Sequence, residues 1–173
     1  MLIKLRSVLW AGSFTGLRVG HAFVKGLAMT RSIPILPVCS MNLIAYNIRK
    51  KDKKIAVILD ARREKFYYSL YKRTSYGLHV VRKATLLKPD ELLEQLKGTM
   101  PCGITGDALR KHRGLFQSIM GNEDCFYPET KWHVNAESFL PYLQETKKKK
   151  TITARKLVPS YLRETEAEEK FVG

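Results

Sequence analysis

The 173-residue sequence has few acidic residues in its first half. Residues 1–86 contain 17 lysines and arginines but only three acids, Asp52, Asp60 and Glu64. Residues 87–173 contain 14 basic and 13 acidic residues, so the net charge of +15 comes almost entirely from the first half. Such asymmetry favours an anionic partner on one face, and nucleic acid is the usual candidate. A solubilising surface, or a basic patch that meets an acidic protein, would account for the same charge.

The sequence also lacks the cysteine and histidine spacings of disulfide frameworks and metal sites. It has three cysteines, no two of them within four positions of each other. An odd count at such spacing argues against a disulfide framework and against a zinc ribbon. The four histidines are never three to five residues apart, so no helix carries a histidine pair for a metal. We therefore expect no metal site and a reducing, cytoplasmic location.

Long hydrophobic runs are missing as well. No apolar run approaches the ~20 residues of a membrane span. Lys4 and Arg6 interrupt the apolar residues at the start, so we expect no signal peptide and no contact with a membrane. With 45% hydrophobic and 27% charged residues, the composition excludes a disordered or fibrous chain.

The first third of the chain predicts a strand, a helix, a short strand and a second helix. The first helix is expected to begin near residues 15–16. Its apolar residues recur at i, i+3, i+4, i+7 and i+8, namely Val19, Ala22, Phe23, Gly26 and Leu27. Further apolar residues lie outside that stripe, which indicates a helix that is buried on two sides or docks a partner. Residues 33–38 predict an edge strand between prolines, and residues 41–48 a helix after Ser40 as N-cap.

The remainder predicts three strands joined by short turns, then helix, strand and helix. The strands are expected at residues 55–59, 66–71 and 78–84. Pro89 suits the first position of the next helix, and Asp107 is a candidate cap for the helix after the strand at residues 102–106. A final helix is expected from Ala136 to Leu143, across Pro141.

The order βββαβα is the unit of ribonuclease-H-like and actin-like lobes. We therefore predict an α/β protein with a two-lobed, actin-like fold (ASKHA type) whose first lobe lacks its opening strands. Residues 1–52 form the partial first lobe with its docking helix, residues 53–146 the second lobe, and residues 147–173 a basic linker and tail.

The most specific segment is GSFTGLRVG at residues 12–20. Glycines and small hydroxyl residues at a helix start can present backbone N–H groups to an anion, but the spacing is neither GxGxxG nor GxxxxGK[ST]. Local chemistry therefore favours a tight turn with close helix packing. The residues of this turn are Gly12, Ser13, Phe14, Thr15, Gly16 and Arg18.

As a string, this segment resembles GPGSFTGLRIG of the bacterial TsaB (YeaZ) family. Other segments resemble family motifs in the same order: residues 25–28 (KGLA), residues 59–67 (LDARREKFY, beside LDARRGEVY), residues 103–107 (GITGD) and residues 159–163 (PSYLR, beside PxYLR). The resemblance spans residues 8–163. Trp10 and Ala11 replace the family's Gly-Pro, and family members carry further residues before this point. We therefore expect a truncated reading of a longer gene or a shortened variant.

The resemblance implies an actin-type fold that has lost catalysis and acts as a scaffold in making N6-threonylcarbamoyladenosine in tRNA. The implied partners are a TsaD-type transferase subunit, a TsaE-type ATPase, a second copy of the chain, and tRNA through the complex. It implies no cofactor held by this chain itself, with ATP or ADP at the complex interface. Candidate contacts on the first helix are Leu17, Val19, Phe23, Val24, Gly26 and Leu27, with Met29 beside them.

Two alternatives remain open. A stand-alone RNA-binding module would use cations for phosphate and an aromatic ring for stacking. Its residues would be Lys50, Lys51, Lys53, Lys54, Arg62, Arg63 and Lys65, with Tyr67 or Tyr71. A peptidase or nuclease would use Asp60 at a strand end as a metal ligand. Pairing of Asp60 with its neighbouring arginines is the commoner case, and no nucleophile–base pair is evident, so we expect no catalysis by this chain.

Overall fold

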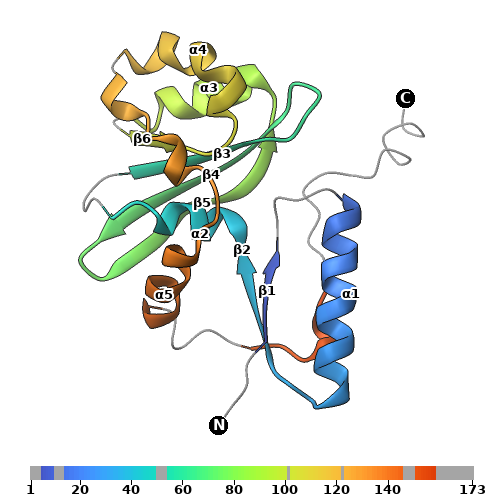
Figure 1. Ribbon diagram of the computed structural model, residues 1–173. Helices are drawn as coiled ribbons and strands as arrows, with labels where there is room; N and C mark the ends of the chain where they lie inside the picture. Colours follow the sequence, from blue (N-terminus) through green and yellow to red (C-terminus); the bar gives the residue numbers. More distant parts are fainter. Residues whose placement is uncertain are drawn as a thin grey trace. The chain divides into compact units, whose positions relative to one another are not determined.

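The protein divides into two compact units, shown in the computed structural model of Figure 1. The structure describes residues 5–9, 14–49, 54–100, 102–121, 123–145 and 151–158. The first unit comprises Met1–Ser40 and Lys148–Gly173, and the second comprises Met41–Lys147. We expected a division after residue 52 and a separate tail. Backbone hydrogen bonds instead attach the segment around Ile152 to the first unit, and side-chain contacts attach the helix after Ser40 to the second.

The first unit contains a parallel pair of strands connected by a long helix. Strand β1 (Leu5–Leu9) pairs with β2 (Ile35–Cys39), and α1 (Phe14–Thr30) runs between them. Ile35 and Ile152 exchange backbone hydrogen bonds of 2.9 and 2.8 Å, which join the segment before η3 (Ala154–Lys156) to β2. Among the described residues of this unit, Ala28, Ile35, Ala154 and Leu157 form one buried apolar cluster, and Leu36 and Val38 of β2 are also buried.

The second unit is built on a four-stranded sheet with the order β5-β4-β3-β6. The strands are β3 (Lys54–Asp60), β4 (Phe66–Thr74), β5 (Gly77–Leu87) and β6 (Cys102–Thr105). β3, β4 and β5 are antiparallel neighbours, which confirms the predicted meander, and β6 adds to β3 in parallel. β3 reads as one apolar run because it is an inner strand with both faces covered.

Helices cover both faces of this sheet (Figure 1). Helices α3 (Pro89–Lys97) and α4 (Leu109–Met120) pack on the face that carries Phe66 and Tyr68. On the other face, the Tyr71 hydroxyl donates to Asn42 of α2 (Ser40–Tyr46) at 2.8 Å. α2 in turn meets α5 (Ala136–Glu145) through an edge-on pair of tyrosine rings with centroids 5.4 Å apart. Phe66 and Tyr68 therefore lie on one face of β4 and Tyr71 on the other.

One expected cap differs in the structure, and the expected last helix is confirmed. Asp107 does not cap α4, because its carboxylate accepts the backbone N–H of Asp60 at 2.9 Å, and Ala108 takes the N-cap position. α5 continues through Pro141 to Glu145, anchored by Ser138 and Tyr142, which are buried on either side of the proline. The short turns η1 (Glu123–Cys125) and η2 (Glu129–Lys131) were not expected.

Candidate functional site

The most regular apolar stripe of α1 faces solvent within its unit. Val19, Phe23 and Leu27 recur every four residues and are 64%, 67% and 43% exposed. Gly20 and Gly26 lie on the same side of the helix, and a Cβ atom built on either would have no neighbour within 4 Å. An exposed stripe with two glycines lets the backbone of another helix come close while the large side chains pack around it.

The opposite side of α1 packs against the first unit's own core. Ala28 is buried there, and Val24 is half-buried against the same cluster. His21 is buried, and its Nδ1 lies 2.8 Å from the Leu17 carbonyl oxygen. Of the residues expected at a partner interface, Val24 therefore belongs to the unit's core and Leu17 is half-buried. Met29 is exposed but lies roughly 120° around the helix from Phe23, so the structure places it outside the stripe. The remaining expected contacts are exposed.

The glycine-rich turn is described only in part. Gly12 and Ser13 lie outside the described residues. Phe14 and Thr15 form the start of α1. Gly16 and Arg18 are exposed in the first turns of the helix.

The turn between β3 and β4 has an unusual backbone. Arg62, Arg63 and Glu64 have φ angles of 62°, 51° and 55°, so three successive residues with side chains are left-handed. Each such residue costs roughly 1 kcal/mol relative to a right-handed conformation. Two hydrogen bonds close the turn: Ala61 N–H to Lys65 O at 2.9 Å, and Lys65 N–H to Arg62 O at 3.1 Å. Arg62, Arg63 and Glu64 are exposed at its tip.

Asp60, the residue with the strongest catalytic character in the sequence, is engaged in holding this turn. Its Oδ1 accepts the Arg62 N–H at 2.7 Å, and its Oδ2 lies 3.6 Å from Lys111 Nζ of α4. Its own N–H donates to Asp107, whose pKa is raised by burial against the lowering effect of that hydrogen bond. The carboxylate thus caps the backbone and pairs with Lys111.

The basic residues proposed for RNA are not one cluster. Lys54 begins β3 and the two arginines follow its end, so the length of the strand, about 20 Å, separates them. Lys54 Nζ donates to the Thr99 carbonyl oxygen at 3.1 Å. Lys50, Lys51 and Lys53 lie outside the described residues. Tyr71 is buried, so it cannot stack on a base, and Tyr67 is half-buried.

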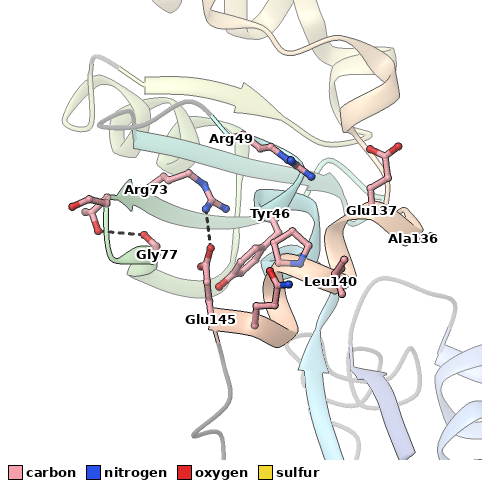
Figure 2. A pocket seen from close by; sticks show the side chains of 12 residues that line it. Tyr46, Arg49, Arg73, Gly77, Ala136, Glu137, Leu140 and Glu145 are labelled. Carbon is pink, nitrogen blue, oxygen red and sulfur yellow. Dashed lines mark hydrogen bonds and ion pairs between the residues drawn. The ribbon is translucent and has the colours of Figure 1, made fainter.

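A cavity of about 740 Å³ lies between the end of α2, the β4–β5 hairpin and α5 (Figure 2). Arg73 of β4 forms its charged wall, with a side chain only 9% exposed. Its Nε donates to the Ile48 carbonyl oxygen at 2.7 Å, and its Nη1 lies 3.3 Å from Glu145 Oε1. The guanidinium also stands 5.1 Å from the centroid of the Tyr46 ring. Burial, followed by the hydrogen bond and charge of Glu145, raises the pKa of Tyr46.

No motif in the sequence predicted this cavity. The only signal was an arginine near the end of a strand rich in aromatic residues. Its Nη2 is buried with no hydrogen-bond partner in the described part of the chain. The arrangement ties both strands of the hairpin to α5, because Glu145 pairs with Arg73 of β4 and also accepts the Leu78 N–H of β5 at 3.2 Å.

The sequence also predicted that the chain has no metal site and no membrane span, and the structure bears on both only for the residues it describes. Within those residues, no three His, Cys, Asp or Glu side chains are placed to hold a metal ion. Over the same ranges, no helix has the length and apolar character needed to cross a membrane. The three cysteines are free thiols, and burial raises the pKa of Cys102 to about 11.

Comparisons with known proteins give the class first. The fold matches YeaZ from Pseudomonas aeruginosa with a TM-score of 0.68 at 18% identity, over 92% of this chain and 73% of that one. A second structure, of an uncharacterized protein with similarity to peptidase YEAZ from the same organism, gives a TM-score of 0.71 at 19% identity, over 92% and 73% of the two chains. The protein is therefore a mixed α/β protein with the actin-like fold of YeaZ, as predicted.

Sequence comparison then gives the family. The family model described as "TsaD: tRNA N6-adenosine threonylcarbamoyltransferase" matches residues 12–171. The chain is 33% identical over 162 residues to the tRNA threonylcarbamoyladenosine biosynthesis protein TsaB of Bacillus subtilis (strain 168), covering 93% of this chain and 69% of that protein. Identity to the Escherichia coli (strain K12) protein of the same name is 29% over 173 residues, covering 94% and 71%. The chain belongs to the TsaB family.

Proposed function

We propose that this chain is a non-catalytic, cytoplasmic subunit of the assembly that forms N6-threonylcarbamoyladenosine in tRNA, and that α1 docks it to a TsaD-type transferase. The relatives are named for this biosynthesis. The structural observation that carries the docking proposal is the stripe of Val19, Phe23 and Leu27, which are all exposed beside two open glycines.

Burial of this stripe would stabilise an interface. Removing a large apolar side chain from water contributes about 1.5–3 kcal/mol when it is fully buried. Three such side chains on one helix face, with glycines between them, match the requirements of a close helix–helix contact. A second copy of the chain would meet the same requirements, and a TsaE-type ATPase with ATP or ADP at the interface remains a prediction.

The geometry around Asp60 supports the non-catalytic part of the proposal. One carboxylate oxygen accepts a backbone N–H of the turn, and the other faces the Lys111 ammonium. A carboxylate that is used in this way fixes a loop, whereas a catalytic carboxylate needs an oxygen directed at substrate or metal.

The proposal predicts that Phe23→Glu abolishes co-purification with the TsaD-type transferase of the same organism. A charge in the middle of the docked stripe would be buried without a partner, which lowers affinity by at least about 100-fold. Met29→Glu is the matched control, since Met29 is 61% exposed but lies roughly 120° around the helix from Phe23.

Gly26→Glu is expected to act like Phe23→Glu, because it fills the open path beside the stripe. Retention of the transferase by both variants, with melting temperatures equal to that of the unaltered protein, would refute docking through α1. Loss of a homodimer in place of the transferase would identify a second copy as the occupant.

A further inference from the structure

The turn at residues 61–65 presents two arginines on strained and exposed backbone, and the docking role proposed above does not use it. Arg62 and Arg63 stand at its tip, with left-handed φ angles of 62° and 51°. Glycine or asparagine adopts this conformation at a lower cost than arginine, so the backbone conformation alone does not favour arginine here. Backbone strain of this kind is found where the surrounding structure holds side chains in place for a ligand.

The surrounding structure does hold this turn. The Asp60 carboxylate accepts the Arg62 N–H at 2.7 Å, and the Asp107 carboxylate accepts the Asp60 N–H at 2.9 Å. Asp107 follows β6, which runs parallel to β3, so the turn is fixed to two adjacent strands at their carboxyl ends. The arginines are therefore carried on a rigid support.

Helix α4 adds a third cation beside the turn. Lys111 Nζ lies 3.6 Å from Asp60 Oδ2, and its side chain is 72% exposed. An ammonium has three donors, so this contact leaves it able to bind a further acceptor. Arg110, the preceding residue, forms an ion pair with Glu129 and is not part of the cluster. The exposed acid of the turn is Glu64.

We propose that Arg62, Arg63 and Lys111 form a phosphate-binding surface for the tRNA on which the assembly acts. This inference rests on the function proposed above. Guanidinium groups bind phosphate through two parallel N–H donors, and fixed geometry increases the selectivity of such contacts. Lys54 is not part of this surface, because it lies at the other end of β3 and its ammonium donates to Thr99.

The test measures the affinity of the full chain, alone and bound to the transferase, for an unmodified tRNA transcript over a series of salt concentrations. In the double variant Arg62→Gln/Arg63→Gln, we expect the affinity at 50 mM salt to fall roughly tenfold. The slope of log affinity against log salt should fall by about 1.5, because two phosphate contacts are lost. Lys111→Gln should reduce the slope by about half as much.

Two further variants make the test specific. Arg82→Gln/Lys83→Gln removes the same charge from exposed positions of β5, where Arg82 pairs in register with Leu70, and it should change the affinity less than twofold. Glu64→Gln removes the acid at the tip and should tighten binding about twofold. An unchanged affinity in the turn variant, or equal losses in the turn and β5 variants, would overturn the site.

The outcomes separate this inference from the docking role. If the chain assembles with the transferase but the turn substitutions leave its tRNA affinity unchanged, only the phosphate site is contradicted. A chain that shows turn-dependent tRNA binding but never co-purifies with the transferase contradicts the proposed function. Loss of the transferase in the Arg62→Gln/Arg63→Gln variant would show that the turn contacts an acidic protein surface instead, and would also overturn the inference.

Discussion

At the scale of single residues, unusual backbone conformations define the edge of the sheet where β3 and β6 end. Three consecutive residues, Arg62, Arg63 and Glu64, have left-handed backbone conformations. Gly106 has a φ angle of 121° just after the end of β6. A Cβ atom on Gly106 would lie 2.1 Å from the Ile58 carbonyl oxygen. Both features lie at the carboxyl ends of β3 and β6, so this edge of the sheet depends on conformations that few residues adopt.

Glu64→Gly is expected to raise the free energy of unfolding by about 1 kcal/mol, because glycine has no Cβ atom to oppose the left-handed conformation. The added freedom of glycine in the unfolded chain offsets part of the gain. Glu64→Ala keeps the Cβ atom and should change stability by less than about 0.5 kcal/mol. Denaturant unfolding of the three proteins checks this, and equal stability of the glycine and alanine variants would contradict it.

Gly106→Ala is expected to destabilise the protein by about 3 kcal/mol or more, since the new methyl group meets the Ile58 backbone and the φ angle is unfavourable for alanine. Gly114→Ala is the matched control in α4, where a Cβ atom meets nothing within 4 Å. There, the better helix propensity of alanine should add about 0.5–1 kcal/mol. Thermal unfolding should therefore shift in opposite directions for the two variants, and a shared direction would contradict the account.

The sequence predicts where these two features lie but not their backbone conformation. The string at residues 59–67 singled out the turn, and Gly103–Asp107 singled out the neighbouring strand end. Nothing in the sequence predicts left-handed arginines, because the conformation is imposed by Asp60 and by the five-residue connection between β3 and β4. A separate tertiary contact, the hydrogen bond from the Asp60 N–H to the Asp107 carboxylate, removed Asp107 from its expected capping position.

At the scale of elements, periodicity predicted the helices and strands well but did not predict which face of a helix is buried. The stripe through Val19 and Phe23 is the usual signature of a core-facing surface, yet it is exposed, and Val24 and Ala28 face the core. Both stripes are apolar, so the choice between them depends on what else packs in the unit. The cavity beside Arg73 could not be predicted from the sequence either, because it forms where α2, β4 and α5 meet.

The tie between β4 and α5 yields a prediction at this scale. Glu145→Gln should lower the free energy of unfolding by about 1–2 kcal/mol, because Arg73 is left buried without its carboxylate while the amide still accepts the Leu78 N–H. Glu137→Gln, an exposed position in the first turn of the same helix, should lower it by less than about 0.5 kcal/mol. Urea unfolding distinguishes the two, and equal effects would show that the ion pair contributes nothing.

At the scale of the whole molecule, the two proposed binding surfaces lie on different units. The basic first half of the sequence is distributed over both units, and the residues nearest to Asp60 form one defined cluster on the second. The exposed stripe of α1 belongs to the first unit. The fold class followed from the order of the elements, whereas the family followed from strings such as residues 12–20 and was then shown by comparison.

The most direct test of the subunit role is a reconstituted reaction. Purified TsaD-type and TsaE-type proteins are incubated with unmodified tRNA, ATP and the threonylcarbamoyl donor, with and without this chain, and N6-threonylcarbamoyladenosine is measured by mass spectrometry of the digested tRNA. We expect product to form only when the chain is present, to be lost with Phe23→Glu and to be retained with Met29→Glu. Equal product without the chain, or product from the chain in the absence of the transferase, would contradict the account.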